Sequence, residues 1–264
     1  MKVYSQNVWN HNPVEYRNSL IHSMIREENA DICLFQECGP ETNRAGSVSL
    51  PELLKYEYTE VCPEVADKNF TPIFFKKDKY NLIDSGYFLY TGFNDVNSKS
   101  ITWAVLEERD SLKCLAVVST HFWWKFDSIE DNLQRLQNVK ELKEICDDLI
   151  ERYRVPVIIG GDFNNGENAD QGDEPYKAML QLGFKDLRLA APKVVNCYTH
   201  HAYPVCNDSG IYQDGSMPDK TLDYIFLYGD FEISIQEFEI VIKQKALDSS
   251  DHCPLIASVE FLKE

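Results

Sequence analysis

The stretch VIIGGDFN, residues 157–164, decides the fold of this chain, because it combines an apolar strand with an acid at its end. Pro156 precedes three β-branched residues and two glycines, which lead directly into Asp162, and Asn164 follows two positions later. A short apolar run of this kind predicts a buried strand. We therefore expect Asp162 at the carboxyl end of a core strand, where its carboxylate is available for chemistry.

Two further apolar runs each lead into a polar side chain. The run ICLFQ, residues 32–36, ends on Glu37, and the run LAVVST, residues 115–120, ends on His121. Asn7 lies near the end of the first predicted strand. Each of these strands delivers one polar group at its carboxyl end, so the groups are candidates for a shared site.

The order is reversed near the C-terminus, where the polar group comes before the apolar run. Asp223 precedes YIFL at residues 224–227, and Asp251 and His252 precede PLIA at residues 254–257. If these two strands run antiparallel to the first three, all of the polar groups meet at one edge. Carboxylates gathered in one cleft repel one another by roughly a few kcal/mol per close pair. A hard divalent cation relieves this repulsion, and Mg²⁺, Mn²⁺ and Ca²⁺ prefer oxygen ligands.

The remaining sequence alternates apolar runs with helical patterns. Apolar side chains at steps of three and four predict a long helix over 128–153. Close strand pairs, together with strands separated by helices, favour mixed sheets that pack against each other with helices outside. The other predicted elements are helices over 13–28 and near 174–182, and strand pairs formed by 71–76 with 80–90 and by 101–107 with 113–120.

The composition limits the partners of the protein. The chain has 264 residues, 44% of them apolar and 26% charged, and its 26 basic and 43 acidic residues give a net charge of −17. This composition is typical of a globular protein and excludes disorder over the whole chain. The acidic balance disfavours long nucleic acid as a partner and favours a small phosphorylated substrate. No linker or repeat divides the chain, so we expect one domain over residues 1–264.

The sequence also bears on location. No apolar run approaches the ~20 residues that span a bilayer, and no basic segment followed by an apolar one marks a signal peptide. Of the eight cysteines, Cys33 and Cys114 lie inside apolar strands, where a free thiol behaves as a small hydrophobic group. We therefore expect a cytoplasmic protein with reduced cysteines and no membrane span.

Six motifs, in this order, resemble those of the endonuclease/exonuclease/phosphatase superfamily, the pancreatic-deoxyribonuclease-like hydrolases. They are SQNV at 5–8, LFQE at 34–37, STH at 119–121, GDFN at 161–164, LDYIF at 222–226 and SDHCP at 250–254. The resemblance covers nearly the whole chain, and GDFN and SDH are its most specific parts. It implies an α+β fold, a four-layer α/β/β/α sandwich of two mixed, largely antiparallel sheets with helices outside and the site at one edge. It also implies a divalent-metal-dependent hydrolase of phosphoester bonds.

The resemblance implies which residues hold the metal. Asn7, Glu37 and Asp251 would hold or orient it, with Mg²⁺ as the expected ion and Mn²⁺ or Ca²⁺ as alternatives. Some DNA-repair members of the superfamily carry an acid two residues after the first Asn, whereas this chain has Trp9 there. This departure favours one principal metal over a two-metal arrangement.

Five residues would carry the chemistry in such a family member. Asp162 would accept a proton from the attacking water as general base. Asn164 would hydrogen-bond the nucleophile or a phosphoryl oxygen. His252 would contact the phosphoryl group as charge develops, oriented by Asp223 at its other ring nitrogen. His121 would donate to another phosphoryl oxygen or assist the leaving group.

The substrate is less defined, because the superfamily includes nucleases, deadenylases, sphingomyelinases, inositol-polyphosphate phosphatases and toxins. The aromatic residues within 122–126 could stack on a base or sugar, or touch lipid. The polar segment over 196–220 is a candidate specificity loop. The candidate substrate contacts in these two segments are Trp123, His200, His201 and Tyr212.

Three functions remain open from the sequence. The first is a metal-dependent phosphodiesterase or phosphatase that acts on a small or lipid-linked phosphoester, which the net charge of −17 favours. The second is a nuclease on DNA or RNA, which would require a local basic groove beside the site. The third is a non-catalytic module that binds phosphoesters on the same fold. The third is disfavoured, because every position needed for chemistry is filled.

Overall fold

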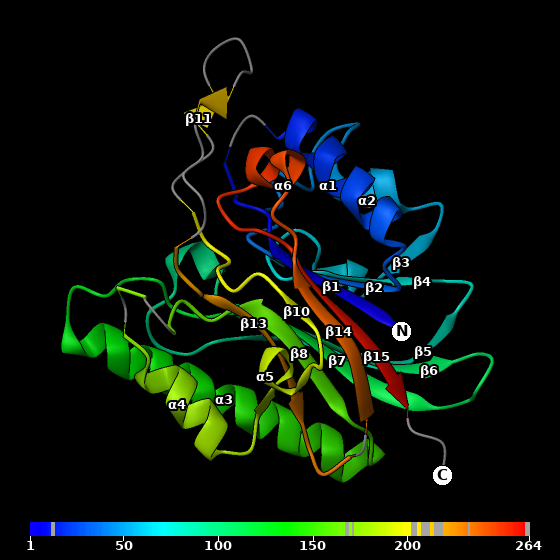
Figure 1. Ribbon diagram of the computed structural model, residues 1–264, viewed down its shortest axis with the longest axis vertical. Helices are drawn as coiled ribbons and strands as arrows, with labels where there is room; N and C mark the ends of the chain where they lie inside the picture. The colour runs from blue at the N-terminus through cyan, green and yellow to red at the C-terminus, as the bar shows by residue number, and fades with distance from the viewer. Residues whose placement is uncertain are drawn as a thin grey trace.

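Two large β-sheets pack face to face, and helices cover their outer faces (Figure 1). The structure is a computed structural model that describes residues 1–11, 14–166, 169–170, 172–201, 205–206, 212–213, 219–231 and 233–261. For residues 205–206, 212–213 and 261 it describes the backbone only. The helices are α1 (Glu15–Glu28), α2 (Leu50–Leu54), α3 (Ile129–Tyr153), α4 (Glu174–Gln181), α5 (Leu187–Ala190) and α6 (Gln244–Ser249). The strands are β1 (Lys2–Asn7), β2 (Ile32–Gln36), β3 (Tyr58–Glu60), β4 (Ile73–Lys76), β5 (Tyr80–Leu89), β6 (Ser100–Glu108), β7 (Cys114–His121), β8 (Val157–Asp162), β9 (Lys185–Asp186), β10 (Val194–Val195), β11 (Val205–Cys206), β12 (Tyr212–Gln213), β13 (Asp223–Tyr228), β14 (Ile233–Ile240) and β15 (Leu255–Phe261).

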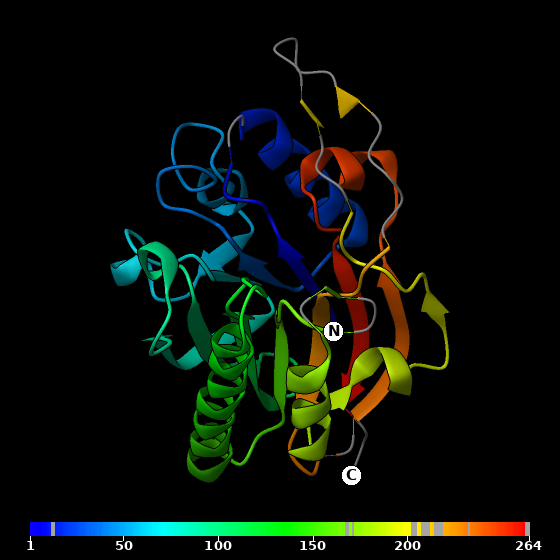
Figure 2. The same ribbon diagram turned by 90° about the vertical axis from the view of Figure 1, so that its left-hand side faces the viewer.

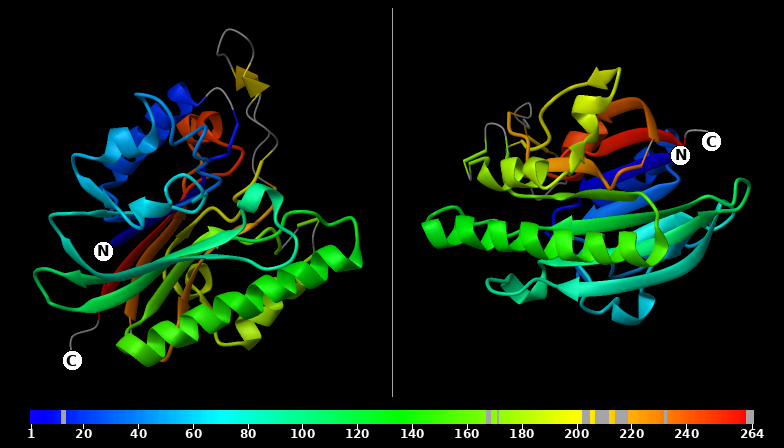
Figure 3. Two further views of the ribbon diagram at one scale, coloured as in Figure 1. Left: turned by 180° about the vertical axis from the view of Figure 1, so that it is seen from behind. Right: turned by 90° about the horizontal axis from the view of Figure 1, so that it is seen from below.

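The described strands form a seven-stranded sheet in the order β10-β14-β15-β1-β2-β4-β3 and a six-stranded sheet in the order β5-β6-β7-β8-β13-β9, beside a ribbon of β11 and β12. Both large sheets mix parallel and antiparallel neighbours. Helices α1 and α6 lie on the outer face of the first sheet, and α3 and α4 lie on the outer face of the second (Figures 1 and 2). Figure 3 shows α3 running along the six-stranded sheet from behind and from below. This α/β/β/α sandwich confirms the predicted fold class.

Alternating side chains along each strand divide the interior into three apolar layers. In β1, Val3 packs between the two sheets, whereas Tyr4 packs with side chains of α1 and α6. In β7, Val117 faces the other sheet and Val118 packs against α3. Consecutive residues fall in different layers because side chains alternate between the two faces of a strand. The α3 positions that pack on the sheet belong to the predicted apolar stripe: Val139, Leu142, Cys146 and Leu149.

Strand direction brings the polar strand ends to one edge. Strands β1 and β2 are parallel, as are β7 and β8, whereas β15 and β13 are antiparallel to β1 and β8. Asp162 is therefore level with Asp223 on one side and with His121 on the other. A hydrogen bond from Asn7 to Asp162 joins the corresponding edges of the two sheets. The antiparallel condition on which the predicted convergence depends is thus met.

Two glycines let the strands approach closely next to this edge. A Cβ on Gly160 would lie 2.7 Å from Leu34 Cδ1 and 2.8 Å from Ser5 Oγ in the facing sheet. A Cβ on Gly161 would lie 2.5 Å from the backbone oxygen of Thr120 in the neighbouring strand. These glycines are therefore required by close packing inside the structure.

Most predicted elements are confirmed, but one predicted strand pair is wrong. The long helix α3 follows Ser128, whose Oγ accepts a hydrogen bond from the Asp131 N–H as part of a capping box. Strands β6 and β7 pair as predicted. The run 71–76 does not pair with 80–90, because β4 pairs with β2 and β3 while β5 pairs with β6 in the other sheet. The four residues of β4 are buried and suit an interior strand, whereas β5 is half-exposed and suits a sheet edge.

Within the described part of the chain, no helix combines the length and the apolar character needed to cross a membrane. The cysteines whose side chains are described carry free thiols. The cytoplasmic location and the single domain over 1–264 stay predictions.

Candidate active site

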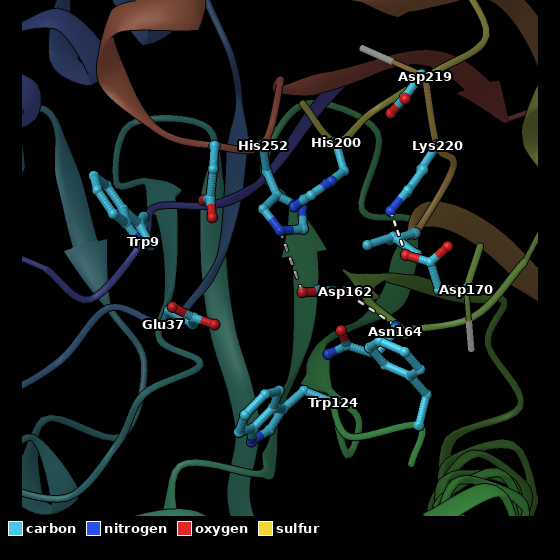
Figure 4. Close-up of a pocket in the computed structure, with 13 residues that line it drawn as sticks. Trp9, Glu37, Trp124, Asp162, Asn164, Asp170, His200, Asp219, Lys220 and His252 are labelled. Atoms are coloured by element: carbon cyan, nitrogen blue, oxygen red, sulfur yellow. Dashed lines mark hydrogen bonds and ion pairs between the residues drawn. The ribbon is translucent and has the colours of Figure 1, made fainter. Parts of the chain in front are cut away.

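The polar strand ends meet in one pocket of about 510 Å³ at the edge of the sheets. Figure 4 shows Asp162 near its centre, with Trp9 and Glu37 on one side and Asp170 and Lys220 on the other. Three predicted residues do not line the pocket but contact residues that do. Asn7 and His121 contact Asp162, and Asp223 contacts His252. The described residues that line it are Trp9, Glu37, Trp124, Phe126, Asp162, Asn164, Asp170, His200, Asp219, Lys220, Leu222, Asp251 and His252.

Asp162 is buried, and its surroundings bring its pKa close to neutrality. Oδ2 accepts a hydrogen bond from Asn7 Nδ2 at 2.9 Å, and Oδ1 accepts one from the Asn164 N–H at 2.9 Å. Burial raises the pKa of Asp162 to about 7; the charge of Asp223 adds to this, whereas His252 and the two hydrogen bonds oppose it. A carboxyl group with a pKa near neutral pH can take up and release a proton, as a general base must.

His252 is a protonated imidazole held by Asp223. Its Nδ1 donates a hydrogen bond to Asp223 Oδ2 at 2.8 Å, and the same oxygen accepts one from Thr199 Oγ1 at 2.6 Å. Burial alone would lower the pKa of His252, but the carboxylates of Asp223 and Asp162 raise it well above its usual value. The other ring nitrogen, Nε2, lies 3.8 Å from Asp162 Oδ2. His252 therefore brings a positive charge to the pocket.

His121 has the opposite character and is neutral. Its fully buried Nε2 lies 3.0 Å from Lys99 Nζ and 3.1 Å from Asn164 Nδ2. Burial lowers the pKa of His121 well below its usual value, and the charges of Lys99 and His252 lower it further. Because an ammonium group only donates hydrogen bonds and a neutral imidazole has one accepting nitrogen, that nitrogen accepts from Lys99, whose Nζ lies 3.2 Å from Nδ1 as well. The predicted role of His121, which is to donate to a phosphoryl oxygen or to assist the leaving group, stays a prediction.

Besides Asp170, Asp219 and Lys220 of the pocket lining, the sequence reasoning missed the buried residue Lys99. It is only 4% exposed, and burial lowers its pKa, while the charges of Glu37 and Asp162 oppose that effect. The signal was nevertheless present, since Lys99 directly precedes β6, which is antiparallel to β7. Like Asp223, Lys99 precedes a strand that is antiparallel to its neighbour, so the start of that strand lies at the edge where the neighbouring strand ends.

Glu37, Asp251 and Asn7 carry oxygen donors that could hold a divalent cation. Burial raises the pKa of Asp251 to about 6, and the charge of Glu37 adds to this, whereas His252 opposes it. The charge of Glu37 therefore disfavours the ionised form of Asp251, and a cation would relieve this repulsion. Such hard donors suit Mg²⁺, Mn²⁺ or Ca²⁺, so the donor set fits the predicted metal. Three groups of side chains have ligand atoms within 4.8 Å of one another: Glu37, His121 and Asp162; His200, Asp251 and His252; and Asp162, Asp223 and His252.

Three residues that line the pocket have left-handed backbone conformations. The φ angles are 54° at Trp9, 54° at Glu37 and 49° at Asn164, and each residue follows the carboxyl end of a strand by one or two positions. Asn tolerates this conformation, but at Trp and Glu it costs on the order of 1–3 kcal/mol. Strain gathered at two strand ends of one pocket is typical of a functional site.

The candidate substrate contacts are distributed differently from the prediction. His200 lines the pocket, with its ring 4.8 Å from the ring of His252, and burial lowers the pKa of His200 to about 2. His201 is buried, and its Nε2 donates to Ser250 O at 2.9 Å. The side chain of Tyr212 lies outside the described residues.

Trp123 is also absent from the pocket lining. It is 5% exposed, and its indole N–H donates to Asp131 Oδ1 of α3 at 2.6 Å. Its backbone N–H donates to Asn138 Oδ1 of the same helix at 3.1 Å. These anchors direct Trp123 into the structure, and Trp124 and Phe126 line the pocket in its place.

Comparison with known proteins supports the same family. Residues 4–252 match the sequence profile of the Endonuclease/Exonuclease/phosphatase family. No curated protein matches the sequence significantly. Among solved structures, the endonuclease/exonuclease/phosphatase from Bacteroides vulgatus shares 22% identity and a TM-score of 0.75, over 99% of this chain and 98% of that chain.

Two other similar structures carry different activities or ligands. The mannosyl-6-phosphatase of Bacteroides thetaiotaomicron shares 17% identity and a TM-score of 0.73, over 99% of this chain and 100% of that chain. TDP2 of D. rerio, solved in complex with a single-strand DNA product, shares 16% identity and a TM-score of 0.68, over 98% of both chains. At these identities the likeness supports the fold and leaves the substrate to be argued from the site.

Proposed function

Because the chain belongs to the endonuclease/exonuclease/phosphatase family, as its six motifs predict, we propose that it is a divalent-metal-dependent hydrolase of small or lipid-linked phosphoesters. The observation that carries the proposal is the placement of Asp162, whose pKa is about 7, between a protonated and a neutral histidine. His252 lies on one side at 3.8 Å, and His121 lies on the other at 3.5 Å. A base and a positively charged donor thus face one position in the pocket.

In the proposed mechanism, Asp162 takes a proton from water as the water oxygen attacks phosphorus and the ester P–O bond breaks. The hydrogen bond from Asn7 holds the accepting carboxylate in place. His252 donates from Nε2 to a phosphoryl oxygen as negative charge develops there. Asp223 keeps the ring oriented through its hydrogen bond with Nδ1.

Lys99 does not line the pocket, but its ammonium group contacts His121 and would add positive potential on the phosphoryl side. Glu37, Asp251 and Asn7 would hold the cation, with Mg²⁺ as the expected ion and Mn²⁺ or Ca²⁺ as alternatives. When bound, such an ion supplies Lewis-acid polarisation of the phosphoryl oxygens.

Nuclease activity has less support from the pocket. Lys220 is the only lysine or arginine among the described residues that line the pocket. Its side chain forms an ion pair with Asp170. A nucleic-acid chain would need several such cations along its phosphates. A non-catalytic binding module would not need a carboxylate with a pKa near 7 between two histidines.

The test is hydrolysis of p-nitrophenyl phosphate and bis(p-nitrophenyl) phosphate with Mg²⁺, Mn²⁺ or Ca²⁺, and with EDTA. We expect turnover that stops on chelation and falls by ~10²–10⁴-fold in Asp162→Asn. Plasmid DNA in a parallel assay tests the nuclease alternative. No turnover with any of the three ions, or equal rates in wild type and Asp162→Asn, would reject the proposal. Phosphoester binding without hydrolysis in both proteins would point to the binding module.

A further inference from the structure

The pocket has a polar wall that the proposed chemistry does not use. Asp170, Asp219 and Lys220 lie together on the side of the pocket opposite Glu37, and Lys220 forms an ion pair with Asp170 (Figure 4). Carboxylates only accept hydrogen bonds and an ammonium group only donates them. Since a hydroxyl group can both donate and accept, this wall suits a ligand that carries several hydroxyls.

Backbone hydrogen bonds hold this wall in register with His252. His200 forms β-bridges with both Lys220 and His252. The His200 N–H donates to Lys220 O at 3.0 Å, and the Asp219 N–H donates to His200 O at 3.2 Å. The distance between the polar wall and the phosphoryl-binding side is therefore set by backbone, so the wall can select one part of a substrate.

Aromatic side chains form another part of the lining. Trp124 and Phe126 are 44% and 48% exposed, although both line the pocket. The indole N–H of Trp124 donates to Asp95, and the adjacent Trp123 is anchored on α3. The Trp124 ring is thus held beside the pocket, where its exposed face can pack against a ring of a ligand.

Trp9 completes the aromatic lining, in a strained conformation that the buried Arg17 supports. The guanidinium group of Arg17 donates to the backbone oxygens of Val8 at 2.8 Å and of Trp9 and Ser249 at 2.9 Å. It also lies 4.9 Å from the centre of the Trp9 ring. A strained aromatic residue that its neighbours hold in place is preorganised for contact with a ligand.

The charge of the lining opposes a second phosphate. Three of its carboxylates already belong to the proposed phosphoryl centre, so Asp170 and Asp219 are left beside the leaving group. These two would repel another phosphate, since Lys220 is already paired with Asp170. Among the described residues, the carboxylates that line the pocket are Glu37, Asp162, Asp170, Asp219 and Asp251.

We propose that this pocket selects phosphomonoesters whose alcohol part is an uncharged, hydroxyl-rich ring, such as a hexose monophosphate. The ring packs against Trp124 and Trp9, and its hydroxyls bond to Asp219, Asp170 and Lys220. This inference rests on the proposed function and names its substrate class. Hydrolysis transfers the phosphoryl group to water and releases the ring alcohol and inorganic phosphate.

The experiment measures phosphate release with Mg²⁺ from glucose 6-phosphate, mannose 6-phosphate, glucose 1,6-bisphosphate, phosphocholine and p-nitrophenyl phosphate. We expect kcat/KM for one or both hexose 6-phosphates to exceed that for the bisphosphate and for phosphocholine by at least ~10-fold. Asp219→Ala and Trp124→Ala should each lower it by ~10-fold or more. The loss on p-nitrophenyl phosphate, which has no hydroxyl-rich ring, should be at least ~5-fold smaller.

Asp110→Asn is the matched control. Asp110 is exposed in the turn between β6 and β7, at the end of these strands opposite to the pocket. The kcat/KM of this variant should equal that of wild type on every substrate. Thermal melts check that each variant is folded. Turnover of p-nitrophenyl phosphate without a hexose preference, or equal losses on all substrates, overturns this inference alone. Preference for phosphocholine or for the bisphosphate also overturns it. No turnover of any phosphoester overturns the proposed function as well.

Discussion

Replacing Asp162 by Asn should stabilise the metal-free protein while it abolishes most of the activity. The carboxylate is 1% exposed, and burial raises its pKa from 3.8 to about 7. Each pKa unit is worth about 1.4 kcal/mol, so the ionised form destabilises the folded state by up to about 4 kcal/mol above pH 7. The attraction of His252 is already included in this shift. Part of the gain is lost in the variant, because the carboxylate accepts hydrogen bonds from Asn7 and Asn164 with its two oxygens, whereas an Asn side chain has one accepting oxygen. We therefore expect a net increase of about 1–3 kcal/mol in the free energy of unfolding at pH 8.

The sign of the pH dependence follows from the same shift. Between pH 4 and pH 7 the folded state holds the Asp162 proton more tightly than the unfolded state does. Wild-type stability therefore falls as pH rises through this window, and the variant lacks this contribution. The stabilisation should be present at pH 8 and largely absent at pH 5.

Urea denaturation in EDTA at pH 5 and pH 8 measures both effects, with Asp110→Asn as the control for removal of an exposed acid. The reasoning is refuted if Asp162→Asn is no more stable than wild type at pH 8. It is equally refuted if the difference between the two proteins is the same at both pH values.

Three further predictions test neighbouring parts of the site and the fold. Asp223→Asn should lower kcat on p-nitrophenyl phosphate by ~10²-fold or more and lower the pKa of His252 in an NMR titration, because Nδ1 loses its carboxylate. Lys99→Met should lower kcat/KM by ~10-fold or more while the protein still melts cooperatively, because the charge beside His121 is removed and the volume is kept; unchanged kinetics would exclude Lys99 from the mechanism. Gly161→Ala should cost about 1–3 kcal/mol or more in chemical denaturation, since its Cβ would lie 2.5 Å from a backbone oxygen that cannot move aside. A neutral substitution would mean that the strands do not pack this closely.

The convergence at the site could be predicted because it rests on two local signals. Asp162 and His121 follow apolar runs, and Asp223 precedes one, so direction alone decides which edge each side chain reaches. The structure bears out that geometry, whereas the chemical role of each side chain stays a proposal. The same rule places Lys99 at this edge, but a lysine before a strand is usually a solvated residue, so the sequence alone does not distinguish it.

In a run of consecutive aromatic residues, the sequence does not predict which side chains are buried and which line the pocket. The outcome depends on hydrogen-bond partners elsewhere in the chain. Trp123 and Trp124 are adjacent, yet one is buried and the other lines the pocket. The difference comes from Asp131 and Asn138, which bind Trp123 from α3. The partner of β4 was predicted wrongly for a related reason. A short polar link predicts a hairpin, but the burial of β4 on both faces requires an interior position.

The features that support the proposed chemistry also oppose folding of the site. Burial raises the pKa values of Asp162 and Asp251 to about 7 and about 6, so both carboxyl groups ionise at a cost near neutral pH. Trp9 and Glu37 add backbone strain on the order of 1–3 kcal/mol each. The surrounding sandwich must offset these terms, which explains why the strands beside the site are fully buried and why Gly160 allows the two sheets to touch. A cation that binds the ionised carboxylates would reverse part of the electrostatic cost, so stability, proton release and metal affinity are linked at this edge.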